Sequence, residues 1–453
     1  MTSMMRRAVR RGRATIRTAL ATLALAGPCA LAPAAAARAQ STAPPRLLLG
    51  DLYRDARRES PRAEAARALA RAAEARVSST RLPPDPQLQL GFMNYTLPGL
   101  EPMDPLGMTQ LQLMQMLPVA GKLGLSARAA DARASAAAAR AGDAVWEVRN
   151  QAAMAFYELY QTDQGLDVAR QTLRLLQDIA STAESMYRVG AGRQADVLRA
   201  QVEIARMTED TIRMRAMRTA MAARLNALLD RAPESGVPSP ALPAFPATIP
   251  SLDSLQRLAR AYRPMLAAGE RDVDAARADE RLARREIWPD LALGVQYGQR
   301  SGEMGVERMG SLMVGASVPI FARGRQLRMR EEAAAMRQMA LADLAAMAAD
   351  TRGRIGEAYA DLERARRLAA LYRTTVIPQS EAAAASALSS YRVGGVDFMT
   401  LLDDRMTVTR YRTELFTLEA DEGKAWAELE MLGGRELFDP NTIVRATADG
   451  GAR

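Results

Sequence analysis

Four stretches of the chain alternate their side chains with a period of two, which predicts β-strands in two hairpins, at about residues 86–117 and 289–319. One face carries Leu88, Leu90, Phe92, Thr109, Leu111, Leu113, Leu291, Leu293, Val295, Tyr297, Leu312, Val314, Ala316 and Val318. The other carries Gln87, Gln89, Gly91, Gln110, Gln112, Met114, Ala292, Gly294, Gln296, Gly298, Met313, Gly315 and Ser317. Membrane barrels and soluble two-sided sheets share this pattern, so it leaves both possible.

Long helices are predicted between the hairpins. Residues 123–187 contain no proline, and about 65 residues of α-helix extend about 100 Å. Two series of positions spaced by seven predict a helix-packing seam: Leu166, Leu173, Ala180 and Tyr187, with Ala169, Leu176 and Ala183. Shorter helices are expected at residues 47–81 and 252–287, broken by Pro61 and Pro264, and Pro378 should kink the second long helix.

The same order of landmarks occurs twice, about 203 residues apart, which indicates a duplicated unit. The clearest pair of landmarks is Tyr187-Arg188-Val189-Gly190 and Tyr391-Arg392-Val393-Gly394. The predicted domains are a first repeat at 40–232 with a turn at 187–193, a Pro-rich linker at 233–250, a second repeat at 251–434 with a turn at 391–397, and a flexible tail at 435–453.

The net charge of +9 comes mostly from the first 39 residues, which hold seven arginines and no acid, so the remainder carries about +2. This segment has a basic start, an apolar stretch at 19–26 and an Ala37-Arg38-Ala39 cleavage site, which predicts a secretory signal peptide at 1–39. The weak remaining charge argues against nucleic-acid binding.

The composition argues against an enzyme. The chain has no His, and its one cysteine, Cys29, lies in the predicted signal segment. No phosphate-binding glycine loop and no convergent carboxylate cleft is recognisable, so no catalytic, cofactor-binding or metal site is assigned and no cofactor is expected.

The strand count predicts an assembly if these strands cross a membrane. Four strands cannot close a barrel, and eight make a filled one, whereas three chains supply twelve strands and an aqueous lumen lined by Gln and Gly.

At each Tyr-Arg-Val-Gly turn the chain must reverse, and we expect Gly190, Gly192, Gly394 and Gly395 to provide left-handed backbone there. Tyr187 and Tyr391 are expected to cap the seam beneath.

These features resemble the TolC-like outer-membrane efflux protein family, over nearly the whole span from Leu47 to Gly434. The resemblance rests on the duplicated order, the entry segment Pro118-Val119-Ala120-Gly121-Lys122 and both turns, together with Ile377-Pro378 and Leu401-Leu402-Asp403. It implies an α+β membrane protein: a homotrimer whose periplasmic coiled-coil tube continues into a twelve-stranded transmembrane barrel, with four strands from each chain. The implied partners are a periplasmic membrane-fusion adaptor, an RND-type inner-membrane pump and outer-membrane lipid.

The resemblance also implies roles for particular residues. The turns become periplasmic tips where the adaptor docks, through Arg188, Val189, Gly190, Arg392, Val393 and Gly394. Family members close the periplasmic mouth with carboxylates just beyond the second turn. Asp403 occupies one such position and is followed by Asp404, whereas the other position holds Thr400, a departure from the family. Arg199 is the first-repeat counterpart of Asp403, so an Asp403–Arg199 ion pair is a hypothesis for the closed gate.

The function that follows is a passive export duct for small molecules or metal ions, in the cell outer membrane and extending into the periplasm. Methionines crowd the hairpins (Met93, Met103, Met108, Met114, Met116, Met304, Met309 and Met313), and thioethers bind soft metals but also fill apolar space, so the heavy-metal branch of the family stays a hypothesis. The alternative is a soluble periplasmic coiled-coil adaptor or scaffold.

Overall fold

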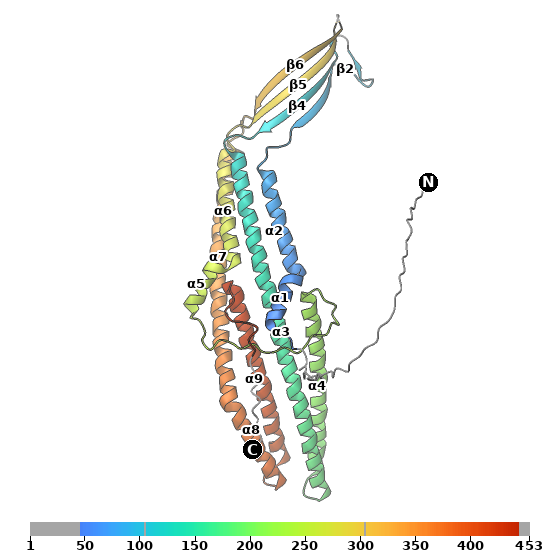
Figure 1. The fold of residues 1–453 in the computed structure, drawn as a ribbon, viewed down its shortest axis with the longest axis vertical. Coiled ribbons are helices and arrows are strands. Elements are labelled where there is room, and N and C mark those ends of the chain that lie inside the picture. The colour runs from blue at the N-terminus through green and yellow to red at the C-terminus, as the bar shows by residue number, and fades with distance from the viewer. Residues whose placement is uncertain (1–45, 104–105, 303–304, 444–453) are drawn as a thin grey trace, which may run out of the picture. The chain divides into compact units, whose positions relative to one another are not determined.

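The computed structural model describes residues 46–103, 106–302 and 305–443. A β-sheet lies at one end of a bundle of long helices, and both helical turns lie at the other end (Figure 1). The predicted signal peptide lies outside the described residues.

The two repeats build corresponding elements in the same order. The first contains α1 (Leu49–Glu59), α2 (Pro61–Thr80), β1 (Gln87–Met93), β4 (Met108–Leu117), α3 (Lys122–Arg188) and α4 (Gln194–Leu228). The second contains α5 (Leu252–Tyr262), α6 (Pro264–Arg285), β5 (Leu291–Gly302), β6 (Gly305–Ala316), α7 (Gln326–Leu371), the π-helical turn η1 (Tyr372–Val376), α8 (Ile377–Arg392) and α9 (Phe398–Gly433). The duplication predicted from the sequence is confirmed, with α7, η1 and α8 of the second repeat in place of the single helix α3 of the first.

Prolines set the short helix boundaries. Pro61 and Pro264 are the first residues of α2 and α6, where a missing N–H costs nothing. The preceding residues, Ser60 and Arg263, are held in extended backbone by the proline ring, which separates α1 from α2 and α5 from α6. Pro378 acts differently: it lies in the first turn of α8, and the π-helical turn η1 directly before it absorbs the disruption of the hydrogen-bond ladder.

The sheet is antiparallel, in the order β1-β4-β5-β6. Its register places Leu88, Leu113, Val295 and Leu312 side by side on one face, and Gln89, Gln112, Gln296 and Ser311 side by side on the other. Both predicted faces are therefore confirmed. The apolar face is uncovered in the single chain, with Leu88 66% and Leu312 76% exposed.

A small second hairpin, β2 (Tyr95–Thr96) and β3 (Glu101–Pro102), leaves the sheet after β1 and was not predicted. Asn94 starts it with left-handed backbone (φ 55°) and donates a side-chain hydrogen bond to the Leu106 carbonyl. Asparagine tolerates this conformation better than most residues, so Asn94 and Pro98-Gly99 were the available signals.

The long helix α3 has 67 residues, and its predicted seam is largely buried. Leu166, Ala169, Leu176 and Ala183 are all at most 4% exposed, but Tyr187, the last seam position, is 45% exposed. The seam therefore ends one turn before the tip.

The centre of the bundle joins the two repeats where α3 crosses α9. Phe156 and Tyr157 of α3 are fully buried, as is Trp426 of α9. Gly423 permits the crossing, because a Cβ at this position would lie 2.2 Å from Cε1 of the Tyr157 ring. The absence of a side chain thus sets the α3–α9 distance.

The predicted linker and part of the predicted tail complete this core. Residues 233–250 run extended over the helices, and Phe245 packs on Tyr157 (6.2 Å between ring centroids) and on Phe438 (5.8 Å). The prediction of a flexible tail is wrong for residues 435–443, because Phe438 also packs on Trp426 and Ile443 pairs with Pro243. Residues 444–453 lie outside the described part.

Within the described ranges, none of the helices is both long and apolar enough to cross a membrane.

We expect Gly423→Ala to destabilise the protein by about 1–3 kcal/mol, because the added methyl overpacks the α3–α9 crossing. The matched control is Gly353→Ala in α7, where an added Cβ meets nothing within 4 Å and helix propensity favours alanine by about 1 kcal/mol. Thermal denaturation in detergent, followed by circular dichroism, measures both. Equal midpoints for the two variants would contradict the crossing constraint.

Candidate functional site: the helical tips and the start of α9

Both tips reverse the chain with one left-handed glycine. Gly190 has φ 76° and Gly394 has φ 74°. Directly after them, the N–H groups of Ala191 and Gly395 donate to the carbonyls of Met186 (2.9 Å) and Ser390 (2.8 Å), which closes the ends of α3 and α8. The two Tyr-Arg-Val-Gly sequences therefore form the same turn.

Left-handed backbone was also expected at the second glycine of each turn. This prediction is wrong, since Gly192 and Gly395 do not adopt positive φ. Gly192 is required for space instead: a Cβ there would lie 3.1 Å from the Tyr187 nitrogen. At Gly395 the corresponding distance, to the Ser390 carbonyl oxygen, is 3.4 Å, which is ordinary contact.

The predicted docking side chains project from the tips. Val189 is 78% exposed and Val393 is 83% exposed, and Arg188 and Arg392 are exposed beside them. A highly exposed apolar side chain therefore stands at each of the two matched turns, where it can contact a partner.

The tyrosines before these turns differ, contrary to the prediction that both cap the seam. Tyr391 is 5% exposed and packs edge-on against Phe398 at 5.7 Å, whereas Tyr187 is 45% exposed and lies outside the buried cluster. Only the second repeat's tyrosine reaches the core, because α8 and α9 bring Tyr391 and Phe398 together.

The two tips share one hydrophobic cluster, formed by Leu176, Ile179 and Ala183 of α3, Ala200 of α4, and Ala387, Tyr391, Phe398, Leu401 and Leu402 of α8 and α9. Burial, together with the nearby carboxylate of Asp196, raises the pKa of Tyr391. Since the cluster takes side chains from α3 and α4 of the first repeat and from α8 and α9 of the second, the two turns rest on a common core.

The start of α9 explains why position 400 holds a threonine where the family resemblance implies a carboxylate. The Asp397 carboxylate caps the helix by accepting hydrogen bonds from the Thr400 N–H (3.0 Å) and the Thr400 hydroxyl. These hydrogen bonds hold the pKa of Asp397 below its usual range. The first-repeat counterpart of Asp397 is Arg193, which makes no side-chain cap on α4.

The predicted gate residues lie one turn further along α9 and are available for contacts outside the chain. Asp403 is exposed and Asp404 is half-buried, while Arg199 is exposed on α4. No ion pair joins Arg199 to Asp403 among the described residues of this single chain, so the gate hypothesis applies to neighbouring copies.

One charged group near the gate was missed by the sequence reasoning. Arg405 is half-buried, and burial, followed by repulsion from Arg412, lowers its pKa. Arg412 itself is held by Glu381 of α8 (2.9 Å). Arg405 directly follows Asp403 and Asp404 in the sequence, and a charged run of this kind on a helix gives no sign that its arginine is partly buried.

The hairpin methionines that lie in the strands share one face of the sheet. The register puts Met93, Met108, Met114, Met116, Met309 and Met313 on the polar face, with Met114 and Met313 on either side of Gly294. Met304 lies outside the described residues. No group of His, Cys, Asp or Glu suited to a metal ion was found in the described ranges.

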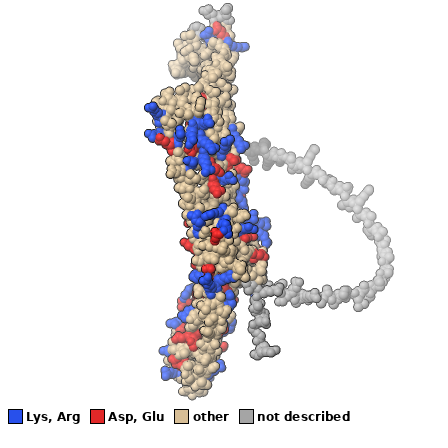
Figure 2. Space-filling model, turned by 90° about the vertical axis from the view of Figure 1, so that its left-hand side faces the viewer, with Lys and Arg blue, Asp and Glu red and all other residues tan. Residues whose placement is uncertain are grey.

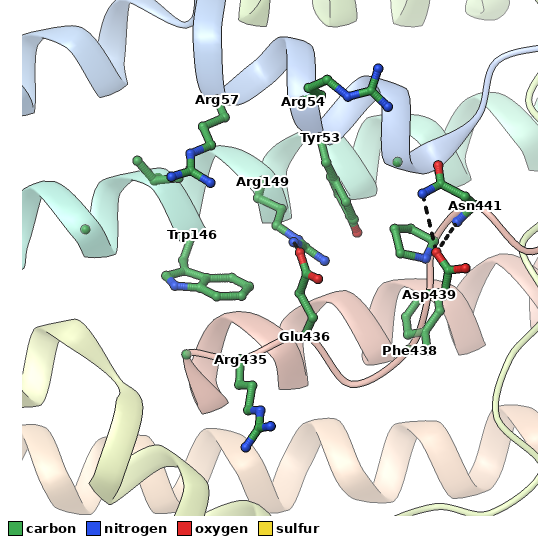
Figure 3. A pocket seen from close by; sticks show the side chains of 15 residues that line it. Tyr53, Arg54, Arg57, Trp146, Arg149, Arg435, Glu436, Phe438, Asp439 and Asn441 are labelled. Carbon is green, nitrogen blue, oxygen red and sulfur yellow. Dashed lines mark hydrogen bonds and ion pairs between the residues drawn. The ribbon is translucent and has the colours of Figure 1, made fainter.

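A cavity of about 1100 Å³ opens beside α1, α3 and the segment after α9 (Figure 3). Arg149 lies at its centre, 3.9 Å from the Tyr53 ring and 5.0 Å from the Trp146 ring. The guanidinium pairs with Glu430 of α9 at 2.8 Å and with Glu436. One arginine therefore links α1, α3, α9 and the C-terminal segment.

Glu430 is the most buried acid of this network, with a side chain 1% exposed. Its second oxygen accepts the backbone N–H of Leu437 at 2.8 Å. Burial raises the pKa of Glu430, against the opposing effect of Arg149. The ionised form therefore depends on the arginine.

Comparison with known proteins shows what this architecture belongs to. The family model described as "Outer membrane efflux protein" matches residues 52–231 and again residues 255–435. The chain belongs to the outer membrane efflux protein family. No curated protein gives a significant match.

Solved outer-membrane channels share the fold. The chain is similar to the channel OprN (22% identity, 85% of this chain and 89% of that chain covered, TM-score 0.72). It is also similar to VceC of Vibrio cholerae (18%, 85% and 96%, 0.72) and to CusC (16%, 86% and 93%, 0.73).

This outer membrane efflux protein is therefore a non-enzymatic channel component of an efflux system, located in the outer membrane and extending into the periplasm. The prediction of an outer-membrane protein is confirmed, and the alternative of a soluble periplasmic scaffold is set aside. The charge distribution agrees with this location, since Lys, Arg, Asp and Glu gather over the helices and are sparse over the sheet (Figure 2).

We expect Arg149→Met to destabilise the protein by about 3–5 kcal/mol near neutral pH, because Glu430 is left buried without its cation. Without the arginine, the folded-state pKa of Glu430 lies further above its unfolded value. A raised carboxyl pKa contributes stability below the unfolded value and loses it as pH rises through the folded value. The destabilisation should therefore shrink as pH falls from about 8 towards 4.

The control is Arg170→Met on the same helix, whose ion pair with Asp167 is exposed and contributes at most about 1 kcal/mol. Thermal midpoints of both variants across this pH range provide the measurement. A loss in Arg149→Met that does not change with pH would show that the buried charge of Glu430 is not its cause.

Proposed function

We propose that three copies of this chain assemble into a passive duct, with twelve strands closing a barrel in the outer membrane and the helices forming a periplasmic tube. The observation that carries the proposal is the sheet: one face is apolar and exposed, and the other carries glutamine and glycine. Lipid would cover the first face and water in the lumen the second. CusC, which shares this fold, forms a transmembrane channel.

The duct receives its cargo from an RND-type inner-membrane pump through a periplasmic membrane-fusion adaptor. Support comes from the tips, where exposed Val189 and Val393 stand on two equivalent turns of one packed surface. The cargo is small molecules or metal ions. Each chain contributes two repeats, at residues 40–232 and 251–434.

We expect single cysteines at the tips, Val189→Cys and Val393→Cys, to cross-link in cells to an adaptor that carries a long helical hairpin. The only other cysteine is Cys29. A cysteine replacing Arg367 on α7, whose side chain is 78% exposed, serves as the control far from the tips. Mass spectrometry identifies the captured protein. Capture of the adaptor from the α7 position and not from the tips would place docking elsewhere.

Three copies of Asp403 would form a ring of carboxylates at the periplasmic mouth, held closed by pairing with Arg199 of neighbouring copies. We expect Asp403→Ala to raise single-channel conductance in planar bilayers and to change its voltage response. Glu414→Ala, which removes an exposed acid further along α9, is the control and should behave as wild type. The gate hypothesis fails if Asp403→Ala conducts as the wild type does.

A further inference from the structure

The two repeats differ at the rim of the sheet, the end that points away from the helices. In the second repeat the strand ends are charged, and Arg300 of β5 pairs with Glu307 of β6 at 2.6 Å. In the first repeat the extra hairpin β2–β3 lies between β1 and β4, and Glu101 is the only charged residue from Gln87 to Met103. One rim segment therefore suits water, and the other exposes apolar side chains that call for a different neighbour.

The tip of the β2–β3 hairpin presents two leucines. Leu97 is 83% exposed and Leu100 is 59% exposed. Leu100 also adopts left-handed backbone (φ 48°), a conformation that a bulky side chain disfavours. Backbone strain of this kind is concentrated at sites of function, so Leu100 points to a role for the exposed tip.

Tyr95 shows on which side of the sheet the hairpin lies. Its ring packs edge-on against Phe92, with 5.3 Å between ring centroids, and its hydroxyl forms a hydrogen bond with the Thr109 hydroxyl at 2.7 Å. Phe92 and Thr109 lie opposite each other on the apolar face. The hairpin is therefore attached on the apolar side and not on the glutamine side, and Figure 1 shows it beside the end of the sheet.

The register shows the level at which the hairpin leaves the sheet. The row of paired residues on the apolar face at this level is Phe92, Thr109, Gln299 and Arg308. Three of these four are polar, whereas the row from Leu88 to Leu312 is wholly apolar. The apolar band thus ends where the hairpin begins, and aromatic side chains such as Phe92 and Tyr95 are typical of this boundary in membrane barrels.

The backbone of the hairpin is paired, which lipid contact requires. The Thr96 carbonyl accepts the Leu100 N–H at 2.8 Å, and the Asn94 carbonyl accepts the Met103 N–H at 3.0 Å. Unpaired backbone groups are costly in lipid, so a hairpin that satisfies its own groups can approach the acyl chains.

We propose that the β2–β3 hairpin is a lipid anchor at the outer rim of the duct, with Leu97 and Leu100 inserted among the acyl chains of the outer leaflet. This inference rests on the barrel proposed above, which puts lipid on the apolar face and the rim at the outer surface of the membrane. The hairpin extends the lipid contact of the sheet beyond its last apolar row. Three such anchors, one from each chain, fix the depth of the duct in the membrane.

The competing neighbour is a second copy of the chain, since β1 is an edge strand and the other free edge is β6. The rim of β6 exposes Glu307 and Arg308. Leucines placed on these charges would remove water from them without supplying a polar partner. Acyl chains match Leu97 and Leu100 in chemistry, so the geometry favours lipid.

The test uses single cysteines labelled with the fluorophore bimane, in full-length Cys29→Ser protein reconstituted into phosphatidylcholine vesicles. Bimane at Leu97→Cys should lose fluorescence when the lipid carries brominated acyl chains and keep it with iodide on both sides of the vesicle. Val306→Cys, an apolar position 57% exposed at the charged rim, is the matched control and should be quenched by iodide instead. Leu312→Cys, on the apolar face, reports whether the sheet itself lies in lipid.

A second experiment tests the leucines themselves, with bimane at Met103→Cys. Leu97→Asp combined with Leu100→Asp should replace quenching by brominated lipid with quenching by iodide, because carboxylates are costly among acyl chains. Leu97→Ile combined with Leu100→Met keeps both positions apolar, so this control should be quenched as the parent is.

The outcomes separate the anchor from the barrel. If position 312 is quenched by brominated lipid, iodide quenching at position 97 overturns the anchor while the barrel stands. Shielding of position 97 from both quenchers, as a neighbouring copy would give, also overturns it. Quenching at position 103 that does not change in the double aspartate variant shows that the leucines are not the anchor. Iodide quenching at position 312 overturns the barrel and the anchor together.

Discussion

The buried contact of Arg149 with Glu430, beside the crossing of Tyr157 over Gly423, is the interaction on which the rest of the structure depends. It joins α3 of the first repeat to α9 of the second, and Glu430 also holds the C-terminal segment through the Leu437 N–H. A buried ion pair of this kind is costly to break from one side only, because the remaining charge keeps its desolvation cost. The pair therefore specifies which helices meet more than it adds net stability.

From this joint the molecule extends in two directions with different chemistry. Towards the sheet, α3 and α6 are joined by ion pairs such as Arg133–Asp279, and Lys122 anchors the strands. Towards the tips, small and apolar side chains pack α3, α4, α8 and α9 into one cluster that supports both turns. The strands and the tips lie at opposite ends of the helices (Figure 1).

Duplication explains why the two halves look alike and where they differ. The Tyr-Arg-Val-Gly turns, the proline breaks and the strand faces are shared, because both repeats must build the same wall. The first turns of the helices that follow, α4 and α9, differ between the repeats. Asp397 caps α9, whereas Arg193 leaves α4 without a side-chain cap. The gate residues Asp403 and Arg199 lie just beyond these unequal starts, so the asymmetry is concentrated at the proposed mouth.

The amino-acid sequence by itself determined the elements, because periodicity and proline act locally: the strand faces, the 67-residue α3, the α1–α2 and α5–α6 breaks and both tip turns followed from it. Only the tertiary structure decided which distant residues meet. Tyr391 is buried and Tyr187 is not, Thr400 serves the Asp397 cap, and residues 435–443 pack onto Trp426 instead of forming a free tail. Such contacts depend on helix crossings set by a glycine and a buried charge pair, and no local pattern encodes the distance between two helices.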